Sequence, residues 1–248
     1  MARKISVAVA TLVVTLLGSS CSTIHDQLQG TQVPADRAPA SSRAPGPILE
    51  TTSWGLVDGM LSVVVRNTTH RTLRFADAVV TARTADDQLV ASSLEYDERA
   101  CCEVHQLDPG QQYGLYVDVG PNGSRIAQVD VAYRNVTWGR TTTGEQLAVT
   151  ARPVGLHAGE RGTVVLADLT SRGPEARVVA QAFLTDRAGD LVAVVSGRWI
   201  CLRPGRQQLR MQLFHPVPAG TQVHRVLVHP VGGDPEHPAP RCGSAPAA

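Results

Sequence analysis

Two similar turns decide the fold of this chain: Leu107-Asp108-Pro109-Gly110 and Leu202-Arg203-Pro204-Gly205. In each, proline pre-sets one backbone angle and glycine tolerates the positive φ beside it, so both segments predict turns. Apolar residues alternate with polar ones after each turn, from Tyr113 and from Leu209. The sequence therefore predicts an internal repeat of two similar β units.

In the first unit, residues 51–140, apolar and polar residues alternate with a period of two. Leu61, Val63 and Val65 share one face of an extended segment, for example. Pairs of residues typical of hairpin turns separate such segments at Asp58-Gly59, Asp86-Asp87 and Asn122-Gly123. The expected strands are 54–57, 61–66, 76–84, 88–94, 113–119 and 126–138.

The second unit, residues 145–233, repeats this plan, with a hairpin turn expected at 186–189. No helical period of useful length occurs in either unit. Short strands at regular spacing favour an all-β fold of antiparallel sandwiches, whose cores rely on Val, Leu and Ala because aromatic residues are few. The expected strands are 147–151, 163–169, 177–185, 191–200, 208–214 and 223–229.

Three motifs of the second unit are shared with a known family: Phe183-Leu184-Thr185-Asp186, Gly189-Asp190-Leu191-Val192 and Leu202-Arg203-Pro204-Gly205. Together they resemble the FxLYD-type immunoglobulin-like domain of bacterial envelope proteins. In the first unit residues 107–110 fit this pattern, whereas 81–87 lack its Phe and Leu. The resemblance implies two tandem immunoglobulin-like β-sandwich domains, 51–140 and 145–233, outside the cytoplasm, and it implies no active site.

The N-terminus is typical of an export signal. Arg3 and Lys4 precede an apolar run over 5–17, and small residues at 18–20 mark a cleavage site directly before Cys21. This arrangement resembles a bacterial lipoprotein signal, which implies a signal peptide over 1–20, a lipid on Cys21 and anchoring at the outer face of the cell membrane. An ordinary secretory signal, and hence a secreted protein, is the alternative.

Two further segments are expected to lie outside the folded units. Residues 21–50 are rich in Pro, Gly and Ser and poor in apolar residues, which predicts a disordered tether from the lipidated cysteine. Residues 234–248 form a Pro-rich tail.

The charge balance argues against a polyanionic partner. Without Arg3 and Lys4, the 23 basic residues fall to 21, against 22 acidic ones. Such a chain has no field that attracts nucleic acid or anionic lipid. We therefore expect that the protein binds no nucleic acid and that it is attached to the membrane only through the N-terminal lipid. The expected partner is an envelope protein or a wall polymer.

The other four cysteines are disulfide candidates because an exported chain meets an oxidising compartment: Cys101, Cys102, Cys201 and Cys242. One pairing joins Cys201 to Cys242 and leaves Cys101 and Cys102 as thiols or as a strained adjacent disulfide. The other joins one or both of Cys101 and Cys102 to Cys201 or Cys242 and clamps the two units together. The sequence does not choose between these pairings.

A metal site at Cys101, Cys102 and His105 is the weaker interpretation of the same cysteines. Thiolate and imidazole are suitable ligands for Cu(I) or Zn(II). Adjacent side chains of a strand point to opposite faces, so both sulfurs reach one ion only if the backbone turns sharply there. A copper, zinc or redox carrier is accordingly the alternative function.

The remaining polar residues suggest no chemistry. Ser196 lacks the setting of a nucleophile elbow, and no Ser, His and Asp arrangement is indicated, so we expect neither an enzyme nor a cofactor. The three Asn residues all begin N-x-S/T sequons, which we interpret as coincidental in a bacterial chain. Four histidines near the C-terminus are expected to be solvated loop residues: His215, His224, His229 and His237.

The sequence thus predicts a non-catalytic binding or scaffolding module of the cell envelope. Loops and uncovered sheet edges are the expected contact surfaces. The two candidate loops are 95–106, the longest insertion that distinguishes the units, and 214–222.

Overall fold

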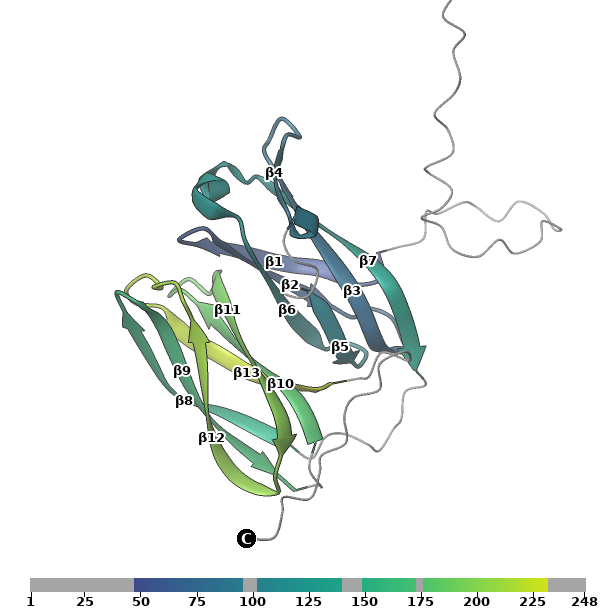
Figure 1. Cartoon of the computed structure of the whole chain (residues 1–248), viewed down its shortest axis with the longest axis vertical. Helices are drawn as coiled ribbons and strands as arrows, with labels where there is room; N and C mark the ends of the chain where they lie inside the picture. Colours follow the sequence, from purple (N-terminus) through teal and green to yellow (C-terminus); the bar gives the residue numbers. More distant parts are fainter. Residues whose placement is uncertain (1–46, 96–101, 140–148, 173–175, 232–248) are drawn as a thin grey trace, which may run out of the picture. The chain divides into compact units, whose positions relative to one another are not determined.

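The computed structural model describes residues 47–95, 102–139, 149–172 and 176–231, and residues 46–248 form one compact unit. Its fold is all-β, built from antiparallel sheets in a sandwich-like arrangement, as the sequence predicts (Figure 1). Among the described residues no helix has the length and apolar character needed to cross a membrane.

The N-terminal half contains two sheets. One has the strand order β1-β2-β6, and in the other the long strand β3 pairs with β4 and β5 and also with β7. The first sheet consists of β1 (Glu50–Val57), β2 (Met60–Arg66) and β6 (Gln112–Asp118). The second consists of β3 (Thr72–Arg83), β4 (Leu89–Ser92), β5 (Glu103–Leu107) and β7 (Gln128–Gly139).

The C-terminal half repeats this strand order. One sheet is β12-β9-β8, from β8 (Val149–Gly159), β9 (Gly162–Ser171) and β12 (Gly205–Leu213). The other is β11-β10-β13, from β10 (Ala176–Thr185), β11 (Leu191–Leu202) and β13 (Gln222–Pro230). Each Pro-Gly turn carries the chain from one sheet to the other, β5 to β6 in the first half and β11 to β12 in the second.

Each half has its own apolar core, and Val57 of β1 also packs into the C-terminal one. The first is built around Leu61, Val63 and Leu115, and the second around Val165, Ala180 and Met211. Val, Leu and Ala dominate both cores, as expected, because alternate residues of every strand face inward. Two aromatic residues contribute to neither core, since Trp54 is exposed and Phe183 lies in a separate small cluster.

Three hairpin turns form where the sequence predicts them. At Asp58-Gly59 both residues have positive φ, and Val57 pairs with Met60 across the turn. Asp87 has a positive φ in the β3–β4 turn, and the Asp186 carboxylate accepts backbone N–H groups in the β10–β11 turn. The fourth prediction was wrong, because Asn122-Gly123 belongs to a 3-10 helix, Gly120–Arg125.

The predicted boundaries also need correction at two places. Residues 103–107, assigned to a loop, form the short strand β5 against β3. Leu49, assigned to the tether, is buried in the N-terminal core directly before β1. The signal, Cys21 and residues 234–248 lie outside the described residues.

Asn67, the first residue of one sequon, is fully buried at the end of β2. Its amide nitrogen donates to the carbonyls of Arg71 and Leu107, each at 2.8 Å, and its oxygen accepts from Thr69. These bonds connect the β2–β3 loop to the end of β5. A side chain used in this way has no free nitrogen for a glycan, so this sequon serves the fold.

Candidate functional site

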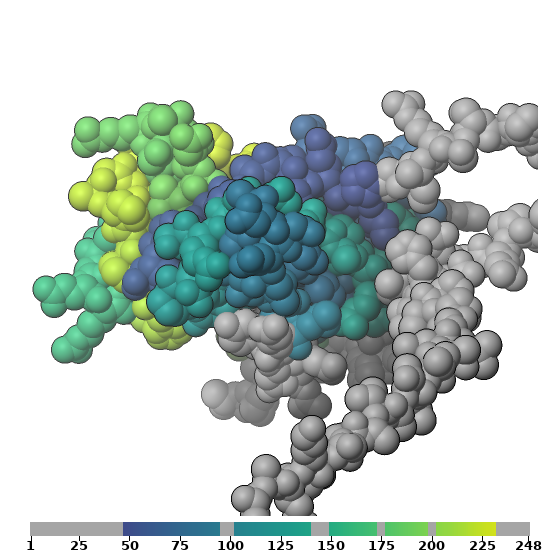
Figure 2. Space-filling view, turned by 90° about the horizontal axis from the view of Figure 1, so that it is seen from above, coloured from purple at the N-terminus to yellow at the C-terminus, as the bar shows by residue number. Residues whose placement is uncertain are grey.

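The outer faces of two sheets, β1-β2-β6 and β11-β10-β13, meet through residues with little or no side chain. A Cβ built on Gly55 would lie 2.1 Å from the Leu191 carbonyl oxygen, and one built on Gly114 would lie 2.4 Å from Val194 Cγ1. Real Cβ atoms do not come that close, so glycine at these positions lets the two backbones approach each other. The space-filling view shows purple N-terminal residues directly beside green and yellow C-terminal ones (Figure 2).

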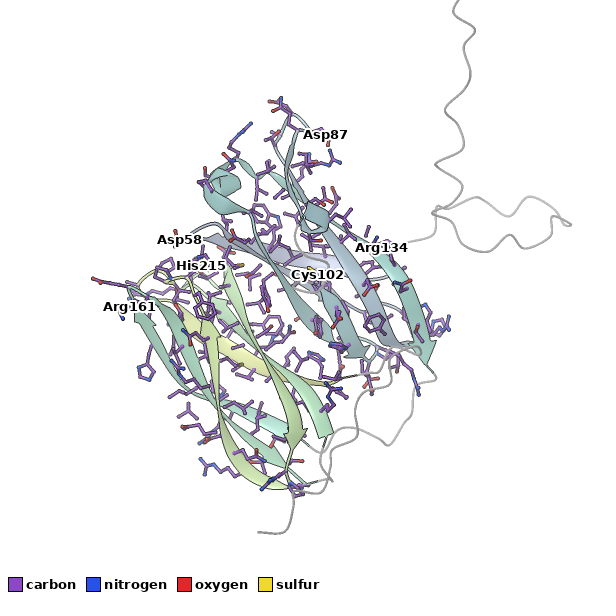
Figure 3. The ribbon with its side chains drawn as sticks, viewed as in Figure 1. Asp58, Asp87, Cys102, Arg134, Arg161 and His215 are labelled. Carbon is purple, nitrogen blue, oxygen red and sulfur yellow. The ribbon has the colours of Figure 1, made fainter. Side chains whose placement is uncertain are left out.

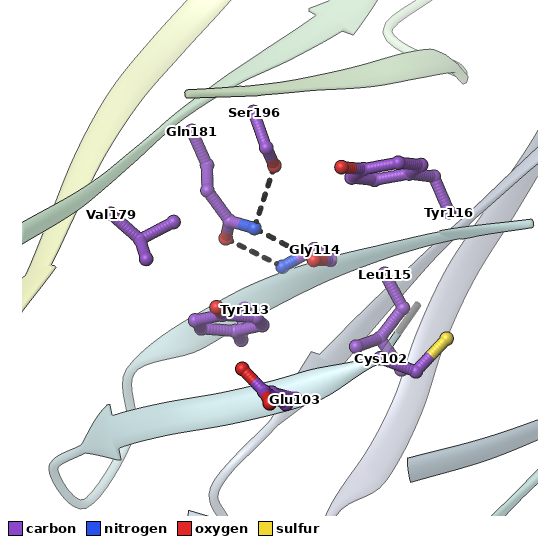
Figure 4. A pocket seen from close by; sticks show the side chains of 9 residues that line it. All are labelled: Cys102, Glu103, Tyr113, Gly114, Leu115, Tyr116, Val179, Gln181 and Ser196. Atoms are coloured by element: carbon purple, nitrogen blue, oxygen red, sulfur yellow. Dashed lines mark hydrogen bonds between the residues drawn. The ribbon is translucent and has the colours of Figure 1, made fainter. Parts of the chain in front are cut away.

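Gln181 of β10 forms the main polar bridge between these sheets. Its side-chain oxygen accepts the Gly114 N–H at 2.8 Å, and its amide nitrogen donates to the Gly114 carbonyl at 2.7 Å (Figure 4). The same nitrogen lies 3.0 Å from Ser196 Oγ on β11. β6 is at the end of its sheet, so this amide occupies hydrogen-bonding groups that a further strand would otherwise pair with.

Ser62 provides a second bridge in the opposite direction. The Val194 N–H of β11 donates to Ser62 Oγ of β2 at 2.9 Å, and the serine is fully buried. β11 is also an end strand of its sheet. Each half therefore satisfies a backbone group at the edge of the other half with a buried side chain.

Apolar and cationic groups complete the contact between the sheets. Val64, Phe183 and Val194 form a small buried cluster separate from the two main cores. The Arg225 guanidinium lies 4.9 Å from the centre of the Phe183 ring and donates to Gln112 Oε1. Burial lowers the pKa of Arg225, but an arginine remains charged at any physiological pH.

A small pocket of about 110 Å³ opens beside the Gln181 bridge (Figure 4). Tyr113 and Tyr116 of β6, Glu103 of β5 and Ser196 of β11 contribute polar groups to its wall. Ligand pockets for drug-sized molecules usually measure about 300 to 1,000 Å³. The volume here suits a few water molecules or a very small polar ligand.

Cys102, the predicted disulfide or metal residue, borders this pocket with a positive φ of 80° and packs against the N-terminal core. Its carbonyl accepts the Ala78 N–H at 2.7 Å. Cys101 and Cys242, like the side chain of Cys201, lie outside the described part of the structure. The pairing of these cysteines stays a prediction.

His105, the third residue of the metal hypothesis, contacts different residues from those around Cys102. It is buried beside Phe75, with the ring centres 6.0 Å apart, and its Nε2 lies 3.4 Å from Glu103 Oε2. Within residues 47–95, 102–139, 149–172 and 176–231, no three His, Cys, Asp or Glu side chains lie close enough together to hold a metal ion.

His229 corrects the prediction of solvated histidines. It lies in β13, is only 2% exposed, and its ring centre is 4.9 Å from that of Tyr113. The sequence pattern did not indicate this, because alternation tells which face of a strand a residue occupies but not whether that face is covered. His224 on the same strand is exposed, as expected, and His237 lies outside the described residues.

The pKa of His229 is lowered to about 4, mainly by burial and to a smaller extent by nearby His105. The Gln106 backbone acts in the opposite direction, although it does not meet hydrogen-bond geometry with either ring nitrogen. The imidazole is therefore neutral at physiological pH.

No protein-family model matches the chain, and no curated protein matches it either. The arguments about function below therefore rest on the residues and their geometry.

Proposed function

We propose that this chain is a cell-envelope lipoprotein that acts as a non-catalytic binding or scaffolding module. Cys21 would carry the lipid, and residues 22–50 would tether the folded unit to the outer face of the membrane. The proposal includes two immunoglobulin-like domains, disulfides among the four remaining cysteines, and an envelope protein or wall polymer as the partner.

The observation that carries this proposal is that the buried polar side chains hold the two facing sheets together. Gln181 and Ser62 bond to backbone groups of the facing sheet, and Ser196 lies within hydrogen-bond distance of Gln181. These side chains hold two sheets together beside a pocket of only about 110 Å³. A rigid unit built this way is suited to present its outer surface to a partner.

The loop after β12, residues 214–222, supports the same function. Phe214 is 77% exposed, the largest exposed fraction among the large apolar side chains of the described residues. Thr163 fixes the backbone next to it, donating to the His215 carbonyl at 3.0 Å and accepting the Val217 N–H at 3.1 Å. His215 also lies 3.6 Å from Asp58 of the β1–β2 turn (Figure 3). An exposed ring on a fixed loop is typical of an anchor residue for a protein partner.

Cross-linking in intact cells, followed by affinity capture, tests this loop. Phe214→Ala should remove the partner that the unmodified chain captures. Leu89→Ala is the matched control, because Leu89 is also exposed but lies in the β3–β4 hairpin. An unchanged set of captured proteins in Phe214→Ala would contradict the role of the loop.

Peptide mapping without reduction, with metal content measured on the same sample, tests the anchor and the cysteines. The proposal expects a lipid on Cys21, release of the Cys21→Ser variant from membranes, and no free thiols. Reduced Cys101 and Cys102 with stoichiometric copper or zinc would favour the metal carrier instead.

A further inference from the structure

The buried histidine of β13 lies at the contact between the two halves. His229 pairs in register with Val179 of β10, whose side chain lines the pocket next to Gln181. Its ring contacts Tyr113 of β6. The imidazole of a C-terminal strand is therefore inserted against β5 and β6 of the N-terminal half.

The Gln106 backbone favours protonation of this imidazole, but burial outweighs it. Neither ring nitrogen of His229 has a hydrogen-bond partner among the described residues, although the side chain is almost fully buried. Burial of a charge without a hydrogen-bond partner or an opposite charge is strongly unfavourable. The neutral ring can remain at this position, whereas a protonated ring would be driven toward water.

The ionisable groups around His229 do not offset its protonation. On β5, the Glu103 carboxylate lies 3.4 Å from His105 Nε2. The group of β6 in contact with His229 is the phenol of Tyr113, which is neutral at acidic pH. The Coulombic effect of His105 lowers the pKa of His229 and so does not favour its protonation.

The remaining strands next to β13 bring no anion to His229 either. The neighbour on β10 is Val179, and Arg177 of the same strand is a cation. On β8, Arg152 is paired with Asp168 across the β8–β9 ladder. Arg225 of β13 is itself cationic and interacts with Gln112.

We propose that His229 acts as an acid-sensitive latch between the two halves, which are held together while the ring is neutral and loosen when it is protonated. The sign follows from linkage. The pKa of His229 is about 4 in the closed form, below the 6.5 of a solvated histidine. The closed form is therefore fully favoured above about pH 6.5 and loses stability as the pH falls toward about 4. This inference does not depend on the identity of the partner or on the lipid.

Amide hydrogen exchange on the full chain measures the opening. The Gly114 and Val194 N–H groups report on the contact because Gln181 and Ser62 of the facing sheets bind them. After correction for intrinsic exchange rates, their protection should fall by about tenfold to fiftyfold between about pH 7 and pH 4.5. Amides of the β9–β12 ladder should keep their protection.

His229→Phe keeps an aromatic ring at this position but cannot be protonated, so the fall should disappear in this variant. His224→Phe is the matched control, because it makes the same change at an exposed position of the same strand, and it should behave like the unmodified protein. An equal fall in His229→Phe, or no fall in the unmodified chain, would overturn the latch.

A histidine-selective NMR titration of the unmodified full chain provides a second measurement that does not depend on the folding of a variant. The His229 ring should titrate near pH 4, together with the loss of protection at Gly114 and Val194. Titration near 6.5 with the contact still closed would contradict the proposal.

Discussion

The outer faces of sheets β1-β2-β6 and β8-β9-β12 come from the same strand order but have opposite properties. Corresponding positions in the two sheets can be found from the two-residue turns that join their first two strands. Val57 pairs with Met60 across the first of these turns, and Gly159 pairs with Gly162 across the second. Counting from these pairs, Gly55 corresponds to His157, and Gly114 corresponds to Arg210. At these positions the first face has glycines and is buried against β11-β10-β13, whereas the second has polar, exposed side chains.

This difference shows what determines which face of a repeated sandwich is covered. The strand order is common to both halves, so the fold alone does not favour one face over the other. Two glycines permit close approach in the first half, while His157 and Arg210 prevent it in the second. Arg152 and Arg206 add exposed charge around Asp168 on the second face.

The largest expected loss of stability comes from placing, on the covered face, the residue that the exposed face has at the corresponding position. Gly114→Arg places a side chain where even a Cβ would lie 2.4 Å from Val194 Cγ1. Overpacking and an unpaired buried charge should together cost about 4 kcal/mol or more of the free energy of unfolding, measured by urea denaturation. Arg210→Gly, the reverse exchange on the exposed face, should cost about 1 kcal/mol. Equal costs for the two changes would refute the comparison.

Loss of the Gln181 amide should have the next largest effect. Gln181→Met keeps the length of the side chain but leaves the Gly114 N–H and carbonyl buried without their partner, which should cost about 3 kcal/mol. Gln208→Met, on the exposed face, is the control and should change stability by less than about 0.5 kcal/mol. The two denaturation midpoints should therefore separate clearly, and coinciding midpoints would show that the bridge contributes little.

The serine bridge should contribute less, because a single hydrogen bond is involved. Ser62→Ala leaves the Val194 N–H without its acceptor and should cost about 1.5 kcal/mol. Exchange of the Val194 amide should accelerate by about tenfold, the rate equivalent of that free energy. A slower or unchanged exchange rate would mean that this amide is protected by packing alone.

The smallest effect is expected on the exposed face itself. Asp168→Asn removes the carboxylate shared by Arg152 and Arg206, whose side chains are 76% and 66% exposed. Solvent screens such pairs, so the cost should be less than about 1 kcal/mol and should decrease in high salt. A cost as large as that of Gln181→Met would show that the exposed face is as important for stability as the covered one.

The sequence predicted the strands well because each has one inward face, and a single core produces a period of two. It missed β5 because Val104 and Leu107, its core residues, are three apart rather than two, and the strand is short. The candidate site was largely beyond sequence reasoning. Cys102, a disulfide or metal candidate from the sequence, borders the pocket, but its role stays a prediction. Gly114, Gln181 and His229 depend on the meeting of two outer faces.

A glycine in a strand does give some warning, since it often marks the close approach of another backbone. Gln181 and His229 gave none, because polar residues that alternate with core residues usually face water. Only the arrangement of the sheets shows that these polar residues are buried.

The Gln181 bridge also determines how the two sheets are aligned along their strands. Contact between apolar faces has little directional preference, so such faces could meet in several offsets. A side-chain amide offers one donor direction and one acceptor direction, and the Gly114 N–H and carbonyl satisfy both. A shift of one sheet by two residues would separate these groups by about 7 Å and leave them unpaired. One glutamine thus selects a single offset, and with it the position of the described turns of one half relative to those of the other.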